Sequence, residues 1–257
     1  MSATSDKTEK EECDEEEEKP EDEDGWQIWT DPLEELPEIE DAFGITSENK
    51  LHGKTVLDVG TDCVKPLYIA LKFEPDKIIG VSEDFSLYPF SSELEQKSRL
   101  LTRTEIHFYG CSLFDDENLR KIMRKEKEEK FDFVLVSKTL HHLRTGECRL
   151  KHKHRDDEKC CIYKFEEHEV FERLFQYGKR VIIFEAFYPQ DKDDDKVRGR
   201  GGYFTTKEWE RIFYYLLRNH RVEFIKPIRC HLEKKELKKV IAKLRQVDYI
   251  CFYVETK

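Results

Sequence analysis

Hydrophobic and polar positions divide most of the chain into two alternating kinds of segment. Short runs dominated by Val, Ile, Leu and Phe are followed by longer stretches in which apolar residues recur at helical spacing. Strands that alternate with helices in this way are typical of α/β domains, in which helices cover both faces of a parallel sheet. We therefore expect a mostly parallel α/β sheet over the larger part of the chain.

The expected strands lie at residues 55–59, 77–81, 105–109, 131–136, 180–184, 222–225 and 249–254. The fourth is apolar almost throughout, as a central strand buried on both faces should be. Helices are expected at residues 66–73, 91–101, 115–130, 166–176 and 233–244, and after the capping-box pattern Thr205-Thr206-Lys207-Glu208. Residues 26–45 are expected to pack against this domain as a lead-in segment, with Trp26, Trp29, Leu33 and Leu36 at roughly helical spacing.

Residues 1–25 depart from this pattern because they are acidic and almost devoid of apolar side chains. They hold 13 acidic residues and 3 lysines, and the whole chain carries a net charge of −11, so the remainder is near neutral. Such a segment cannot offset the entropy lost on ordering, and we expect a disordered acidic tail followed by one folded domain over residues 26–257. The tail is expected to solubilise the chain; the alternative is an acidic arm that keeps nucleic acid off the domain or docks on a basic protein partner.

Targeting signals and cysteine usage favour an intracellular protein. The N-terminus lacks the features of a signal peptide, and no apolar run approaches the roughly 20 residues of a membrane span. The eight cysteines have no framework spacing, which favours reduced thiols. We expect a cytoplasmic protein with no membrane partner, and these features do not exclude the nucleus.

Three ordered blocks carry the most specific chemical signal. The first is the apolar strand Lys54-Thr55-Val56-Leu57-Asp58-Val59-Gly60, which ends in an acid and a glycine. Open α/β sheets often bind a cofactor at such a strand end, because glycine lets a ligand approach the backbone closely. The other two blocks are Phe131-Asp132-Phe133-Val134-Leu135-Val136-Ser137 and Leu140-His141-His142-Leu143.

Together these blocks resemble the first and fourth sequence motifs of class I S-adenosylmethionine-dependent methyltransferases, over a region from about Lys54 to residue 257. The resemblance implies a Rossmann-like fold with a sheet of about seven strands, the last two forming a hairpin. It also implies S-adenosyl-L-methionine as the cofactor and direct in-line methyl transfer, which requires no metal. The methyl acceptor is expected to be a small molecule or RNA, and the near-neutral domain favours the small metabolite.

The same resemblance assigns the cofactor contacts. Asp58 and Gly60 match the positions that hold the methionine end, whereas Asp62 and Val64 stand where the family has further glycines. Ser82 occupies the usual place of the ribose-binding acid, so Glu83 or Asp84 is expected to take that role. Cys111 matches the position beside the adenine amino group, with Asp115 as a substitute, and Asp132 matches an acid that serves structure.

Substrate-side residues are expected beyond the fourth and fifth strands. One wall would carry Ser137, Lys138, His141 and His142, and the other Glu185, Phe187 and Tyr188. Either histidine suits a general base, because its ordinary pKa of about 6.5 permits proton transfer near neutrality. The alternative is that Leu140-His141-His142-Leu143 is a packing segment. Tyr203 would reach the site if the glycine-rich residues 198–203 close as a lid, and otherwise these residues form a connector.

Two inserted loops, residues 144–164 and 188–202, interrupt the α/β pattern. The first contains Cys148, His152, His154, Cys160 and Cys161, which are suitable zinc ligands, but it lacks the paired Cys-x-x-Cys spacing of strong zinc motifs, and we expect no metal. Both loops and the last helix are rich in Lys and Arg, which would suit a phosphate-bearing acceptor such as RNA or would simply be solvated.

A second function class remains open. The departures at Asp62, Val64 and Cys111 also fit a catalytically inactive, methyltransferase-like interaction module. A dinucleotide-dependent oxidoreductase is disfavoured, because Gly60-Thr61-Asp62-Cys63-Val64-Lys65 lacks the glycines that a pyrophosphate needs at a helix N-terminus.

Overall fold

The computed structural model describes residues 36–44, 51–61, 64–83, 91–140, 167–186, 204, 206–226, 229–244 and 249–256. The chain divides into two units, Met1–Asp31 and Pro32–Lys257, and every described residue belongs to the second. The expected acidic tail of residues 1–25, with Trp26, Trp29 and Leu33 of the lead-in segment, therefore lies outside the described residues.

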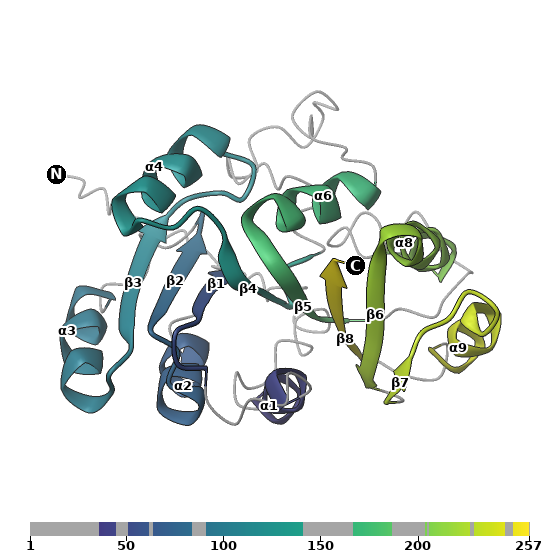
Figure 1. Ribbon diagram of the computed structural model, residues 1–257, viewed down its shortest axis with the longest axis horizontal. Helices are drawn as coiled ribbons and strands as arrows, with labels where there is room; N and C mark the ends of the chain where they lie inside the picture. The colour runs from purple at the N-terminus through teal and green to yellow at the C-terminus, as the bar shows by residue number, and fades with distance from the viewer. Residues whose placement is uncertain are drawn as a thin grey trace, which may run out of the picture. The chain divides into compact units, whose positions relative to one another are not determined.

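A mixed sheet with the strand order β3-β2-β1-β4-β5-β8-β6-β7 forms the centre of the second unit (Figure 1). Neighbours from β3 to β5 pair in parallel, whereas β8 runs antiparallel to both β5 and β6, and β7 runs antiparallel to β6. The strands are β1 (Thr55–Val59), β2 (Lys77–Ser82), β3 (Glu105–Gly110), β4 (Phe131–Ser137), β5 (Gly178–Ala186), β6 (His220–Lys226), β7 (Cys230–His231) and β8 (Tyr249–Thr256).

The predicted fold class is confirmed, with one correction to the strand count. About seven strands were expected, and the described residues form eight. The additional strand is β7, whose two residues pair with Glu223 and Phe224 at the edge of the sheet. A strand of two residues has no alternation of apolar and polar positions, so the sequence gives no signal for it.

Helices cover both faces of this sheet (Figure 1). One hydrophobic core joins α4, α6, α8 and α9 to one face, and a second joins α1 and α2 to the other. α3 contacts β3 at the edge of the sheet. The helices are α1 (Leu36–Gly44), α2 (Val64–Phe73), α3 (Ser91–Leu101), α4 (Asp116–Glu126), α6 (Glu167–Tyr177), α8 (Thr206–Asn219) and α9 (Leu237–Leu244). Among the described residues, none of the helices has the length and apolarity needed to cross a membrane.

The last helix is shorter than predicted, and its first expected turn is not α-helical. The N–H of Glu236 donates to the carbonyl of Glu233 at 2.9 Å, and these residues form a turn before α9 begins at Leu237. In α9 the buried positions are Leu237, Val240, Ile241 and Leu244, which follow helical spacing. The opposite side of α9 is consequently left to polar residues.

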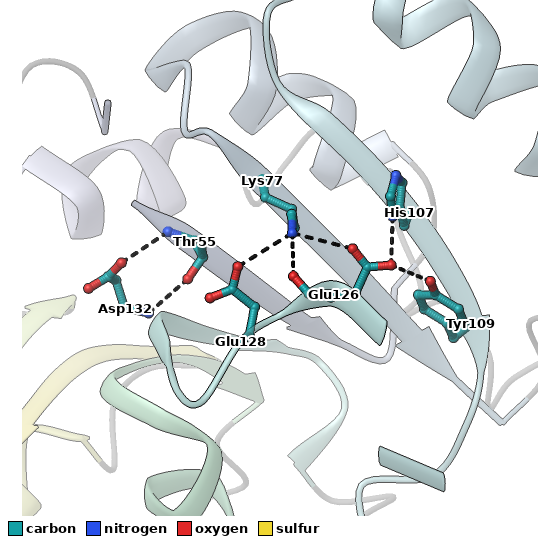
Figure 2. A network of polar contacts seen from close by, with 7 residues as sticks. All are labelled: Thr55, Lys77, His107, Tyr109, Glu126, Glu128 and Asp132. Carbon is teal, nitrogen blue, oxygen red and sulfur yellow. Dashed lines mark hydrogen bonds and ion pairs between the residues drawn. The ribbon is translucent and has the colours of Figure 1, made fainter. Parts of the chain in front are cut away.

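The amino ends of β1, β4 and β5 are joined through one carboxylate, that of Asp132. Its Oδ2 accepts the backbone N–H of Thr55 at 3.1 Å, and its own N–H donates to Thr55 Oγ1 at 3.3 Å (Figure 2). Lys179 Nζ, at the start of β5, donates to Asp132 Oδ1 at 2.9 Å. These contacts give Asp132 a structural role at the amino end of the sheet.

A second carboxylate, Glu126, joins the end of α4 to β2 and β3. Its side chain is 4% exposed, and its Oε1 lies 2.8 Å from His107 Nδ1 and also accepts the hydroxyl of Tyr109 (Figure 2). Lys77 Nζ lies 3.4 Å from Glu126 Oε2 and donates to the Glu126 carbonyl at 2.7 Å. Burial alone would raise the pKa of Glu126, but the hydrogen bonds from Tyr109 and His107, with the charge of Lys77, lower it.

Candidate functional site

Residues that directly follow four neighbouring strands lie along one edge of the sheet. Gly60, Glu83, Cys111 and Lys138 come immediately after β1, β2, β3 and β4. The strand ladders continue into this edge, because Gly60 N–H donates to the Val81 carbonyl at 2.8 Å, Cys111 N–H to Ser82 at 3.1 Å and Lys138 N–H to Phe184 at 2.7 Å. Ligands of open α/β sheets bind at the carboxyl ends of the strands, which makes this edge the candidate site.

Asp58 contributes a fully buried carboxyl group to this edge. It is the penultimate residue of β1 and lies opposite Gly80 of β2 and Leu135 of β4. Its neighbours Leu57 and Val59 pack in the core on the α4 side, so the alternation of a strand places Asp58 on the α2 side. An acidic group is thereby held at the start of the loop that contains Gly60.

Gly60 has the backbone conformation that the sequence motif predicts, and its closest neighbour is another part of the chain. Its φ of +73° lies in the left-handed region, and a Cβ built on it would lie 2.1 Å from Thr139 Oγ1. Thr139 is fixed in turn, since its hydroxyl donates to the Ser137 carbonyl at 2.8 Å. We expected a ligand to lie close to the backbone of Gly60. In the structure, the side chain of Thr139 lies there.

Glu83 and Cys111 lie within electrostatic reach of each other at the ends of β2 and β3. Burial, followed by the negative charges of Asp115 and Glu83, raises the pKa of the Cys111 thiol to about 11. The thiol is therefore neutral at physiological pH, and it donates to the Ser112 carbonyl at 3.3 Å. The Glu83 side chain is exposed.

Asp115, the sequence-based substitute for Cys111, is engaged elsewhere. It is the N-cap of α4, and its carboxylate accepts the Asn118 N–H at 3.1 Å and the Asn118 side-chain amide at 2.6 Å. Its oxygens thus satisfy a helix end rather than facing an open position. Glu83 and Cys111 are the described residues that remain for a ligand at this part of the edge.

Lys138 marks the boundary between β4 and β5. It follows the buried Ser137 and adopts a φ of +49°, which is uncommon for a residue with a side chain. Its Nζ lies 5.8 Å from the ring centroid of Phe184 and 5.7 Å from that of Tyr249, and these two rings stack at 5.5 Å. Glu185, the next residue of β5, is fully buried.

Sequence reasoning did not single out Thr139 or the left-handed conformation of Lys138. Neither residue type predicts its feature, since a positive φ is uncommon for lysine and a threonine gives no sign of a distant contact. The only available signal was indirect, because a glycine after β1 requires some close neighbour and the residues after β4 are adjacent to it in a sheet of this order.

Several predicted site residues lie outside the described residues. These are Asp62, Asp84, His141, His142, Phe187, Tyr188 and Tyr203, with both inserted loops and the Cys/His-bearing segment 148–161. Within the described part of the chain, no three His, Cys, Asp or Glu side chains form a group suited to a metal ion. A groove of about 550 Å³ lies between Leu71 of α2 and Leu101 of α3. These two helices lead into the amino ends of β2 and β3, so the groove lies at the edge of the sheet opposite the candidate site.

Comparisons with known proteins identify the fold. No protein-family model and no curated protein sequence matches the chain. Its fold matches that of geranyl diphosphate C-methyltransferase from Streptomyces coelicolor A3(2), which was solved with Mg²⁺, geranyl diphosphate and S-adenosyl-L-homocysteine. The two sequences are 12% identical, the match covers 88% of this chain and 80% of that chain, and the TM-score is 0.50. It also matches the methyltransferase domain of bacterial CtHen1-C, with 16% identity, 87% and 98% coverage, and a TM-score of 0.50. The chain has the fold of the class I S-adenosylmethionine-dependent methyltransferases.

Proposed function

We propose that this chain is an S-adenosyl-L-methionine-dependent methyltransferase. The observation that carries the proposal is that Asp58, Gly60, Glu83 and Cys111 lie at or directly after the carboxyl ends of β1, β2 and β3, which are neighbours in the sheet. Fold alone does not define an activity, whereas these side chains have chemistry that suits the cofactor.

The residues at this edge suit the parts of the proposed cofactor. A buried carboxylate at Asp58 complements a positively charged amino group, and Gly60, two residues later, turns the backbone out of the strand with its positive φ. The exposed carboxylate of Glu83 suits two ribose hydroxyls. The neutral thiol of Cys111 suits the edge of an uncharged base, since it adds no charge there. Asp62, Asp84 and Ser137 complete the proposed contacts.

S-adenosyl-L-methionine, when bound, supplies an electrophilic methyl group on a sulfonium centre. The chain's own contribution is to orient two reactants and to exclude water between them. Ser137 and Lys138, which leave β4 beside β5, would define the acceptor side. His141 or His142 would accept a proton from an oxygen or nitrogen nucleophile, and Tyr203 would close over the acceptor. The proposed acceptor is a small molecule, with RNA as the alternative.

A non-catalytic interaction module is the second candidate function, and one observation favours it. Thr139 occupies the space against Gly60 into which a ligand was expected to reach, and the following loop carries Asp62 and Val64 instead of glycines. A loop filled by its own chain would retain the fold without binding a cofactor. The distinction is one of affinity and is decided by titration.

The test is calorimetric titration of the whole chain with S-adenosyl-L-methionine and S-adenosyl-L-homocysteine. We expect binding, and a loss of about 10- to 100-fold in affinity for Asp58→Asn, because hydrogen bonds to charged groups contribute about 1.5–3 kcal/mol. Asp132→Asn is the matched control, because its carboxylate lies in the neighbouring strand but at the opposite edge. Absence of binding by the wild type at millimolar ligand would overturn the proposal in favour of the interaction module.

A further inference from the structure

The outer faces of α8 and α9 are strongly basic. In α8 the exposed positions include Lys207, Arg211 and Arg218, and in α9 they include Lys238, Lys239 and Lys243. Lys234 and Lys235 are exposed in the turn that leads into α9. The inner faces of both helices are buried and mostly apolar, so these basic residues share the outward side of each helix.

The two basic faces lie on neighbouring helices. α8 and α9 pack on the same face of the sheet, within one hydrophobic core, and contact each other. Figure 1 shows them next to each other beyond β6. Cations from two segments of the chain are therefore presented together, and we refer to the outer faces of α8 and α9 as the basic surface.

Among the residues that the structure describes, most of these cations form no ion pair. Within the described part of the chain, no ion pair forms at Lys207, Arg218, Lys234, Lys238, Lys239 or Lys243. Lys235 pairs with Glu233 at 2.7 Å, and Arg211 lies 3.9 Å from the buried Glu208. The remaining acids are Glu210 in α8 and Glu236 in the turn before α9, and both are partly buried.

The spacing of the lysines makes this excess costly for an isolated helix. Lys239 and Lys243 lie four residues apart in α9, and like charges at this spacing repel and destabilise a helix. An anionic partner would convert this repulsion into binding energy.

An aromatic side chain interrupts the basic row on α8. Lys207, Arg211, Tyr214 and Arg218 follow the spacing of a single helix face, and Tyr214 is 39% exposed. An exposed ring between cations is the combination by which proteins hold single-stranded nucleic acids, whose bases stack on the ring while their phosphates meet the cations. An acidic protein segment would make no comparable use of the ring.

We propose that the basic surface binds a single-stranded polynucleotide, with its phosphates on the α9 lysines and a base stacked on Tyr214. This inference is independent of the proposed methyl transfer, because the surface is built from residues outside the candidate cofactor site. Its test is therefore run without any cofactor, so that a failure of one proposal leaves the other to its own measurement.

The experiment is a fluorescence anisotropy titration of the whole chain with labelled RNA and DNA of about 12 nucleotides and identical sequence. The variant is K238Q/K239Q/K243Q, in which glutamine preserves the helix propensity. The control, R120Q/K121Q/R124Q, removes the same charge from exposed positions of α4. Circular dichroism melting establishes that both variants are folded.

The affinity of the wild type is expected to fall steeply with salt. In a plot of the logarithm of the binding constant against the logarithm of the salt concentration, each phosphate contact should contribute about −0.7 to the slope. The α9 variant should lose at least about tenfold in affinity at low salt, and its salt slope should fall by about 2. Tyr214→Ala should weaken binding about 5- to 150-fold, whereas Tyr214→Phe should bind as the wild type does. Comparison of the affinities for RNA and for DNA shows which of the two polynucleotides the basic surface prefers.

Three results would overturn the proposal. The first is that the wild type binds neither polynucleotide at about 50 mM salt. The second is that the α4 control weakens binding as much as the α9 variant, which would indicate attraction by net charge alone. The third is that polyglutamate competes as well as the oligonucleotide and Tyr214→Ala has no effect, which would indicate an acidic protein partner instead.

Discussion

Gly60 and Thr139, from the ends of two adjacent strands, are in such close contact that no side chain could stand at residue 60. A Cβ there would lie 2.1 Å from Thr139 Oγ1 and 2.4 Å from its Cγ2. The left-handed φ of Gly60 adds a separate backbone cost for any other residue.

Gly60→Ala should therefore lower the free energy of unfolding by about 3 kcal/mol, the sum of the backbone cost and the overpacking cost. Gly53→Ala is the matched control, because Gly53 also has a φ of +73° but has no atom within 4 Å of its built Cβ. That control should lose only about 1–2 kcal/mol in urea denaturation. Equal losses in the two variants would show that Thr139 does not restrict residue 60.

Asp132→Ala should destabilise the fold by about 1–3 kcal/mol, since it leaves the Thr55 N–H without its acceptor and removes the partner of Lys179. Affinity for any ligand at the carboxyl edge should not change, because Asp132 lies at the amino edge. Thermal melting and the same ligand titration, carried out in parallel, separate the two effects. A change in affinity without a change in stability would contradict the structural role.

The stabilising effect of Glu126 should depend on pH with a definite sign. Its pKa in the folded chain lies below the ordinary value of 4.5, so its contribution is present above pH 4.5 and is lost as the pH falls through the lower folded value. Glu126→Gln should cost about 2 kcal/mol at neutral pH, and this difference from the wild type should shrink below pH 4.5.

Urea denaturation at a series of pH values measures this difference. Glu129→Gln serves as the control, because Glu129 is exposed and its substitution should change stability by less than about 0.5 kcal/mol at every pH. A Glu126→Gln penalty that stays constant below pH 4.5 would mean that packing, rather than charge, accounts for it.

Cys111 should react slowly with iodoacetamide, because burial raises the pKa of its thiol to about 11 and only the thiolate is the nucleophile. At pH 8 we expect alkylation at least about tenfold slower than in the chain unfolded by guanidinium. The rate in the folded chain should still be increasing above pH 9, the ordinary value for the group. Peptide mapping by mass spectrometry follows Cys111 alone, and equal rates in the two states would contradict its burial.

The strands and most helices could be predicted because their apolar patterns are long and regular. The helix at residues 91–101 coincides with α3, and the apolar run at 131–136 coincides with all but the last residue of β4. Glu126 shows where such reasoning stopped. It continues the buried stripe of Leu119, Ile122 and Met123, but a charged residue at that position signals burial only once His107 and Tyr109 are known to face it.

The candidate site was predictable only where it depends on strand ends. Asp58 and Gly60 follow from one short motif, and the parallel order of β1, β2 and β3 brings Glu83 and Cys111 near them. The contact of Thr139 with Gly60 joins residues that are 79 positions apart, and its cause is the sheet order rather than any local pattern. Local propensity carries no information on such a contact.

The antiparallel strand β8 determines when the sheet can be completed during synthesis. It separates β5 from β6, with Arg180 paired to Glu255 on one side and His220 paired to Thr256 on the other. Because a nascent chain emerges from its N-terminus, the parallel strands can assemble first, whereas β6 cannot join them until residues 249–256 have left the ribosome. Until that moment, the apolar sides of α8 and β6 lack the β8 part of their core, and exposed apolar surface of this kind favours aggregation of the growing chain.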